Sequence, residues 1–187
     1  MWARVDQVHG SVVLPVPDVD TRRDTQRAVL LGVGDAMVTT RDDVTLAIFT
    51  ADCAPVAFVA GGVVAAAHAG WRGLLGGVLA STVHEIRRAE PSAPIRAVLG
   101  PCIRPCCYEF GEAELALFAG RFGAEVEGRT RAGARSLDLP RAIGLELERL
   151  KVVGWDEADT CTACSPDFYS YRRDGLTGRQ VMLVARA

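Results

Sequence analysis

The feature that most constrains the fold is a stretch without formal charge that runs from residue 53 to residue 71. Its length alone would suit a membrane span, but a Gly61-Gly62 pair divides it in the middle. We interpret it as a hairpin with apolar strands at 56–60 and 63–67, because glycine supplies the positive φ of a two-residue primed turn. We therefore expect a globular chain that does not cross a membrane.

The register of this hairpin places two reactive side chains on one face. If Ala60 faces Val63, then Cys53 stands opposite Gly70, and Cys53 and His68 become diagonal neighbours about 7–8 Å apart at the backbone. A zinc ion with bonds of about 2.0–2.3 Å to nitrogen and sulfur can bridge that gap. The sequence thus predicts that Cys53 and His68 share a metal.

A third ligand, His9, lies in the string Gln-Val-His-Gly near the start of the chain. Together His9, Cys53 and His68 would form a site with an open fourth position, which is typical of a catalytic metal. Asp52 precedes Cys53, and it would either orient a ligand or carry a proton. The alternative is that Cys53 is an inert buried thiol and both histidines are incidental.

Two arginine-containing segments are candidates for binding an anion such as phosphate. Arg72 follows a predicted strand at the start of a predicted helix, where free N–H groups already favour negative charge. Arg172 and Arg173 follow Tyr171, and an arginine fork matches phosphate while tyrosine can stack on a base. The alternative for both segments is a surface turn without function.

The six cysteines allow a second, structural metal site. Cys161 and Cys164 form a Cys-x-x-Cys pair, and Cys102 with Cys106 would complete a set of four thiolates. Free buried thiols are the simpler interpretation and the one we favour.

Bulk composition excludes several functions. A chain of 187 residues suits one domain, and a net charge of −2 does not favour nucleic acid or a membrane surface as a partner. No apolar run follows the first residues, so we expect no secretion signal and a cytoplasmic protein with reduced thiols. We expect a small-molecule substrate and a monomer or small homo-oligomer.

Hydrophobic periodicity predicts an α/β fold, a layered α/β/α sandwich with a mixed sheet, as a single domain over residues 1–187. Residues 15–34 and 123–136 are expected to be loops. A turn at 41–43 is expected to join two strands. Besides the hairpin, the predicted strands are 11–14, 34–40, 44–49, 95–99 and 180–185, and the predicted helices are 74–89, 112–122 and 140–153.

Five strings occur in one order along the chain: Gln-Val-His-Gly, Thr-Ala-Asp-Cys, Ala-His-Ala-Gly-Trp-Arg-Gly, Gly-Pro-Cys-Ile-Arg-Pro-Cys-Cys-Tyr-Glu-Phe-Gly, and Cys-Thr-Ala-Cys with Ser-Tyr-Arg-Arg-Asp-Gly. In this combination the chain resembles the laccase-domain family, also called multicopper polyphenol oxidoreductases or the YfiH/YlmD family. The resemblance implies an α/β sandwich and a zinc site at His9, Cys53 and His68. It also implies cytoplasmic phosphorolysis of adenosine, inosine, guanosine and methylthioadenosine, and deamination of adenosine.

The chain departs from the family pattern in two places. Members usually carry a further N-terminal segment before Gln-Val-His-Gly, whereas only eight residues precede His9 here. If an arginine of that segment helps to bind substrate, activity is expected to be weaker or absent. Members also often have a histidine where this chain has Ser136, and we expect little consequence from that change.

The leading hypothesis is therefore a zinc-dependent purine nucleoside phosphorylase with adenosine deaminase activity. In the deamination, zinc would lower the pKa of a bound water towards about 7. One alternative is a metal-free hydrolase with Cys53 as nucleophile and His68 as base, which would fit the link of some members to peptidoglycan-precursor editing. A Cu²⁺-dependent polyphenol oxidase would need more histidines than the three present. A protein that binds metal or purine without turnover is the last alternative.

Overall fold

A computed structural model describes residues 1–17 and 28–186, and it is built around a six-stranded mixed sheet. At its centre the hairpin of β6 and β7 pairs in the predicted register, with Ala60 opposite Val63 and Pro55 opposite His68. The strand order across this sheet is β11 (Gly154–Glu157), β8 (Arg96–Leu99), β6 (Ala54–Ala60), β7 (Val63–Ala69), β4 (Ala36–Thr39) and β2 (Val13–Pro15).

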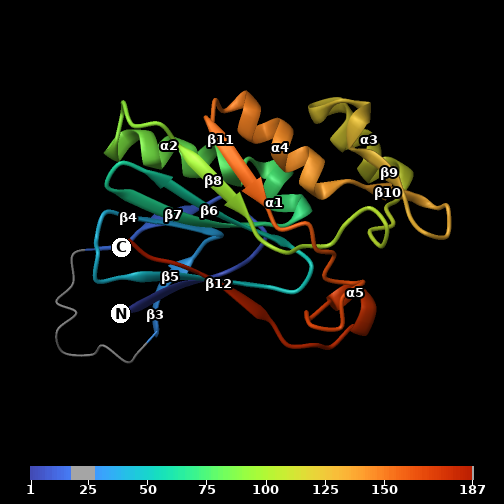
Figure 1. Cartoon of the computed structure of the whole chain (residues 1–187), viewed down its shortest axis with the longest axis horizontal. Coiled ribbons are helices and arrows are strands. Elements are labelled where there is room, and N and C mark those ends of the chain that lie inside the picture. The colour runs from blue at the N-terminus through green and yellow to red at the C-terminus, as the bar shows by residue number, and fades with distance from the viewer. Residues whose placement is uncertain (18–27, 187) are drawn as a thin grey trace.

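Helices cover one face of this sheet (Figure 1). They are α1 (Trp71–Gly76), α2 (Val78–Ala89), α3 (Glu112–Phe122) and α4 (Leu139–Arg149). The buried stripe of α2 packs on the sheet in one hydrophobic core, in which Phe58, Leu79 and Ile86 are almost completely buried. Burial of apolar side chains of this kind supplies most of the stabilisation of such a layered domain.

A second mixed sheet covers the other face (Figure 1). Its strand order is β12 (Gln180–Val184), β5 (Thr45–Thr50), β1 (Trp2–Asp6) and β3 (Ala28–Val33). A smaller core that includes Val5, Met37 and Leu46 fills the space between the two sheets. The predicted single-domain α/β fold with a mixed sheet is confirmed. The predicted α/β/α layering is not, because the layer opposite the helices is a second sheet whose apolar side chains, such as Val5, pack on the first sheet.

One prediction about the first third of the chain was wrong. Within the expected loop 15–34, residues 28–33 form β3, because their alternate side chains face the inter-sheet core, while residues 18–27 lie outside the described part. The turn at 41–43 joins two strands as predicted, and these strands belong to different sheets. β4 belongs to the six-stranded sheet and β5 to the four-stranded one, so this turn crosses between layers.

The helix predictions need smaller corrections. The segment expected as one helix over 74–89 is α1 and α2, separated at Gly77, whose φ of 89° interrupts helical geometry. Asp138 caps α4 as predicted, but the helix ends at Arg149 and Lys151 adopts a φ of 57°. The expected loop 123–136 contains the 3₁₀ turn Ala124–Val126 and a short hairpin of β9 (Glu127–Arg129) and β10 (Arg135–Leu137).

β11 and the short helix α5 (Tyr171–Asp174) were not predicted at all. Both are four residues long, too short to show a hydrophobic period. Among the helices that the structure describes, none has the length and apolar character needed to span a bilayer.

Candidate metal centre and its cavity

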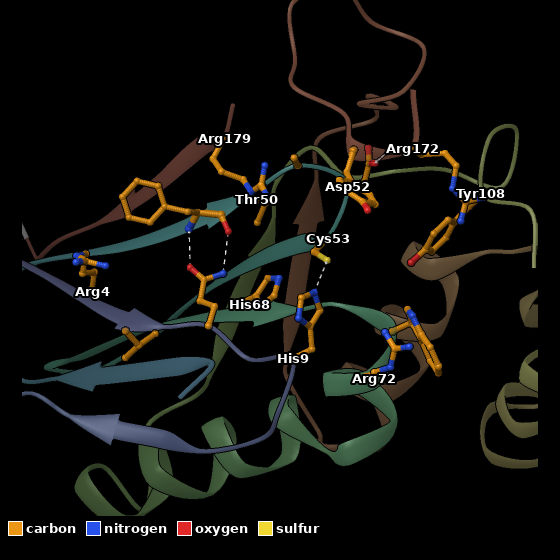
Figure 2. Close-up of a pocket in the computed structure, with 16 residues that line it drawn as sticks. Arg4, His9, Thr50, Asp52, Cys53, His68, Arg72, Tyr108, Arg172 and Arg179 are labelled. Atoms are coloured by element: carbon orange, nitrogen blue, oxygen red, sulfur yellow. Dashed lines mark hydrogen bonds between the residues drawn. The ribbon is translucent and has the colours of Figure 1, made fainter. Parts of the chain in front are cut away.

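Three segments bring His9, Cys53 and His68 together (Figure 2). His68 is near the end of β7, Cys53 lies just before β6, and His9 lies in the turn between β1 and β2. Cys53 Sγ is 3.7 Å from His9 Nε2, and the ligand atoms of all three residues lie within 4.8 Å of one another. The predicted trio therefore converges, with spacings that allow the three side chains to share one ion.

Asp35 organises this centre, although the sequence reading assigned it no role. Its Oδ1 atom lies 2.8 Å from His68 Nδ1 and accepts a hydrogen bond of 2.9 Å from the backbone N–H of His9. Its Oδ2 atom accepts one of 2.7 Å from the backbone N–H of Gly10. A carboxylate on Nδ1 orients the imidazole and leaves Nε2 available to a metal, as in many zinc sites.

The same carboxylate stabilises the strained backbone of the His9 turn. His9 has a φ of 62°, in the left-handed region that costs free energy for a residue with a Cβ. Three consecutive backbone N–H groups, those of Val8, His9 and Gly10, donate to the completely buried side chain of Asp35. Asp35 thus positions one candidate ligand, His9, through its backbone and the other, His68, through its ring.

The pKa values of the trio reflect their proximity. Burial alone would raise the pKa of Cys53, but hydrogen bonds with His68 and His9 outweigh it and lower the pKa to about 7. Burial alone would lower the pKa of His68, but hydrogen bonds with Asp35 and Cys53 raise it to about 9. The metal-free centre therefore favours a thiolate beside an imidazolium, and a thiolate is the form that binds metals or acts as a nucleophile.

Close packing requires glycine at position 70. A Cβ on Gly70 would lie 2.8 Å from His9 Cδ2 and 3.0 Å from Cys53 Sγ. Gly70 has an ordinary φ of −71°, so the requirement is steric and not conformational.

The side chain of Gln7 exchanges two hydrogen bonds with the backbone of Phe49, which attaches the His9 turn to the end of β5.

The centre opens into a cavity of about 610 Å³, a volume typical of small-molecule sites. Four arginines line it and surround the trio in Figure 2, namely Arg4, Arg72, Arg172 and Arg179. Aromatic side chains, Phe49, Trp71, Tyr108 and Tyr171, also line it. A cavity with cationic and aromatic walls suits a ligand that combines a planar ring with an anion.

No sequence motif indicated that Arg4 and Arg179 would line the cavity. Arg4 lies in β1, five residues before His9, and Arg179 directly precedes β12, but neither belongs to one of the motifs. Only the packing of the four-stranded sheet against the central hairpin brings them to the cavity.

The arginines predicted to hold an anion differ in their surroundings. Arg72 lies in the first turn of α1, as predicted, with its guanidinium 4.2 Å from the centre of the Trp71 ring. Arg172 lines the cavity, with its guanidinium 5.1 Å from the centre of the Tyr108 ring and a hydrogen bond to the Glu109 carbonyl.

Arg173 lies outside the lining of the cavity. Its guanidinium makes five hydrogen bonds within the chain, which is the full donor capacity of the group. The partners are Asp174, which accepts two, and the carbonyls of Thr162, Ser165 and Phe168.

Asp52 lines the same cavity but is bonded away from the trio. One of its oxygens accepts a hydrogen bond of 2.7 Å from the Thr162 hydroxyl, and the other accepts one of 2.6 Å from the backbone N–H of Arg172. Asp52 also has a φ of 96°. Its carboxylate therefore connects the Cys53 turn to the segment that carries Arg172, and its predicted role as a proton carrier stays a prediction.

The predicted cysteine set has a different membership in the structure. Cys102 is completely buried, and burial raises its pKa to about 12, which keeps its thiol neutral. Cys107 takes its place, so that the cluster consists of Cys106, Cys107, Cys161 and Cys164. The backbones of Cys102 and Cys161 form a parallel bridge, and the Cys102 side chain lies in the hydrophobic core.

This α/β fold with its three-ligand centre identifies the class of the protein. Residues 1–187 match the model of the family described as multi-copper polyphenol oxidoreductase laccase, and the chain belongs to that family. It is 34% identical to the purine nucleoside phosphorylase YlmD of Geobacillus stearothermophilus, over 99% of this chain and 72% of that one. It is 36% identical to the purine nucleoside phosphorylase YfiH of Escherichia coli, over 96% and 72%.

Solved structures agree with this assignment. The hypothetical protein YfiH of Bacillus licheniformis superposes with a TM-score of 0.86 at 31% identity, covering all of this chain and 74% of that one. YlmD of Geobacillus stearothermophilus superposes with a TM-score of 0.84 at 34% identity, covering 99% and 73%.

Proposed function

We propose that this protein is a zinc-dependent purine nucleoside phosphorylase that also deaminates adenosine. The convergence of His9, Cys53 and His68 at the wall of a cavity with arginine and aromatic sides carries this proposal. Relatives named purine nucleoside phosphorylases support the reaction class. Adenosine, inosine, guanosine and methylthioadenosine are the proposed substrates, and the cytoplasm is the proposed location.

The donor set fits a catalytic zinc ion. Two imidazoles and a thiolate are ligands that zinc prefers, and three protein ligands leave one position for a reactant. When bound, zinc would supply Lewis-acid chemistry and lower the pKa of a coordinated water. A multicopper oxidase would need more imidazoles, but the third histidine of the chain, His84, lies on α2 beside a separate groove.

The chain itself would prepare this centre before any ligand arrives. Asp35 holds the His68 ring through Nδ1 and the His9 turn through its backbone. Because the Asp35 side chain is completely buried, water does not compete for these bonds. The ligands are therefore preorganised, which reduces the free energy lost when an ion or substrate binds.

Phosphate would be held by Arg72 and Arg172. Arg72 combines its charge with the free N–H groups at the start of α1. Of the two neighbouring arginines, Arg172 faces the cavity, whereas the hydrogen bonds of Arg173 within the chain leave it no free donor. In phosphorolysis these cations would place the phosphate and stabilise its charge as the glycosidic bond breaks.

Aromatic side chains would bind the purine ring, and Asp52 would position residues around it. Tyr108, whose ring lies beside the Arg172 guanidinium, and Tyr171 both line the cavity, and their rings can pack against a purine. Asp52 would act as a positioning residue, because it bonds the backbone N–H of Arg172 and lies next to Cys53. Proton transfer by its carboxylate is the alternative role.

A direct assay tests the proposal. The purified protein is incubated with adenosine or inosine, with and without phosphate, and products are separated by chromatography. Ribose 1-phosphate that appears only with phosphate shows phosphorolysis, and inosine formed from adenosine without phosphate shows deamination. His9→Ala, Cys53→Ala and His68→Ala are each expected to abolish both activities, and turnover at the wild-type rate in any of them would refute the assignment of ligands.

One observation favours a second candidate, a hydrolase in which Cys53 is the nucleophile and His68 the base. The pKa of Cys53 is lowered to about 7 by its two histidine neighbours, as expected for an activated thiol. Metal removal separates the two functions. A metal-free protein that still turns over and is inactivated by alkylation of Cys53 would establish the hydrolase and exclude the zinc mechanism.

A further inference from the structure

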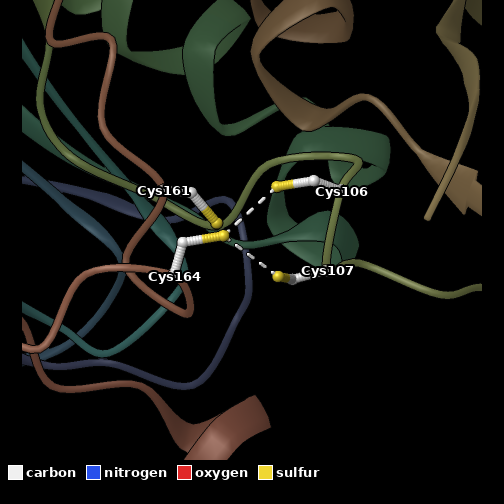
Figure 3. Close-up of side chains that lie close together, drawn as sticks. All are labelled: Cys106, Cys107, Cys161 and Cys164. Carbon is white, nitrogen blue, oxygen red and sulfur yellow. Dashed lines mark hydrogen bonds between the residues drawn. The ribbon is translucent and has the colours of Figure 1, made fainter. Parts of the chain in front are cut away.

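Four cysteine side chains gather at a second position, separate from His9, Cys53 and His68. Cys106 and Cys107 come from the loop after β8, and Cys161 and Cys164 come from the loop after β11 (Figure 3). Their four sulfur atoms lie within 4.8 Å of one another. We propose that these four thiolates bind one structural zinc ion in tetrahedral coordination.

The sulfur spacings fit a single ion. Four sulfurs at about 2.3 Å from a tetrahedral zinc are separated from one another by about 3.8 Å. Cys164 Sγ lies 3.5 Å from Cys106 Sγ and 3.3 Å from Cys107 Sγ. Both separations exceed the bond length of a disulfide, about 2.0 Å. The Cys164 sulfur is also almost equally distant from the sulfurs of Cys106 and Cys107. A shared ion requires such spacing, whereas a disulfide would pair Cys164 with only one of them.

The backbone arranges the Cys-x-x-Cys pair as zinc sites require. The N–H groups of Cys164 and Ser165 both donate to the carbonyl of Cys161, which forms a tight turn and directs both thiols to one side. The N–H of Arg104 donates to Cys161 Sγ at 3.4 Å. A hydrogen bond from an amide to sulfur stabilises the negative charge of a metal-bound thiolate.

The proposed ion would connect two walls of the cavity. From one loop, Tyr108 follows Cys107 directly and lines the cavity. From the other loop, Thr162 lies between the two cysteines, and its hydroxyl donates a hydrogen bond to Asp52. Asp52 in turn precedes Cys53. A zinc ion bound by the four cysteines would therefore hold these cavity walls in place around the centre at His9, Cys53 and His68.

The two centres differ in the way that separates structural from catalytic zinc. The cysteine cluster offers four protein ligands, which close the coordination sphere. The centre at His9, Cys53 and His68 offers three and leaves a position for a reactant. The same chain would thus carry one zinc for stability and one for chemistry.

Metal analysis of the full chain tests this inference. The protein is purified under reducing conditions, dialysed without chelator, and analysed for zinc and iron per chain by mass spectrometry. We expect two zinc ions for the wild type and one for the double variant Cys107→Ser/Cys164→Ser. Cys102→Ala is the matched control, because Cys102 is a buried cysteine of the same loop outside the cluster, and it should retain two.

Cobalt substitution gives a readout that does not depend on the folding of a cysteine variant. Replacing zinc by Co²⁺ in the wild-type protein and in His68→Ala should produce the intense visible and near-ultraviolet absorption of a tetrahedral tetrathiolate complex. Its presence in an inactive His68→Ala protein would separate this site from the proposed catalytic one. A single zinc per chain that is lost in His68→Ala, iron in place of zinc, or a disulfide among the four cysteines in the reduced protein would each overturn the inference.

Discussion

Replacing Asp35 by asparagine is the sharpest test of how the metal centre is preorganised. The two oxygens of Asp35 contact four donors, which are the ring of His68 and the backbone N–H groups of Val8, His9 and Gly10. Asparagine has nearly the same shape but keeps only one acceptor oxygen. Its amide N–H₂ would face donors in place of the second oxygen.

The structure sets the magnitude. Each side-chain oxygen accepts two of the four hydrogen bonds, so Asp35→Asn turns two charge-assisted bonds into contacts between donors. A hydrogen bond to a charged group contributes about 1.5–3 kcal/mol, so losing two should lower the free energy of unfolding by about 3–6 kcal/mol. Loss of a carboxylate partner of a metal-binding histidine also weakens metal binding about 10–100-fold.

Two measurements check these values. Urea unfolding of the metal-free protein gives the stability change, and competition with a chromophoric chelator gives the zinc affinity. Asp42→Asn is the matched control, because Asp42 is exposed in the turn before β5 and should leave both values unchanged. If the unfolding free energy of Asp35→Asn lies within about 0.5 kcal/mol of the wild-type value and the variant binds zinc equally well, Asp35 does not organise the centre.

Three further substitutions test other contacts of the chain. Gly70→Ala should reduce zinc binding by pressing on His9 and Cys53, whereas Gly76→Ala, with only a contact of 3.8 Å to Ser11, should not; equal zinc titrations would refute this. Arg72→Ala should raise the KM for phosphate about 10–100-fold and leave adenosine deamination unchanged, so a parallel loss of both activities would exclude a phosphate role. Glu146→Gln should destabilise the fold by about 1–2 kcal/mol near neutral pH, because Arg149 and Arg121 lose a buried ionic partner.

The last of these has a defined pH dependence. Burial alone would raise the pKa of Glu146, but hydrogen bonds and charge from Arg149 and Arg121 outweigh it and lower the pKa. A lowered folded-state pKa stabilises the fold above the unfolded pKa of about 4.3, and this contribution is lost as the pH falls through the folded value. The difference between wild type and Glu146→Gln in urea unfolding should therefore shrink in acid, and a constant difference would contradict the ionic explanation.

Local patterns predicted the parts of the fold that local forces decide. The Gly61-Gly62 turn sets the pairing of β6 with β7, and that register alone places Cys53 and His68 on one face. Asp138 caps α4 because its side chain reaches an N–H group three residues ahead, which depends on nothing beyond the same turn of chain. Predictions of this kind succeed since their energies come from neighbouring residues.

The failures have an equally physical cause. Residues 28–33 form a strand because β1 pairs with them and Leu31 packs against the inter-sheet core, and neither partner is near them in sequence. Cys107, not Cys102, joins the cysteine cluster because the Cys102 side chain is buried in the hydrophobic core, which cysteine spacing does not reveal.

The sequence by itself determined the α/β class, the central hairpin and the identity of the three ligand candidates. Only the tertiary structure decided that Asp35 lies between His9 and His68, and that arginines from four separate segments share one cavity. These positions depend on how two sheets and their connecting turns pack in space. Such packing energies act between residues far apart along the chain, so no local pattern of residues contains them.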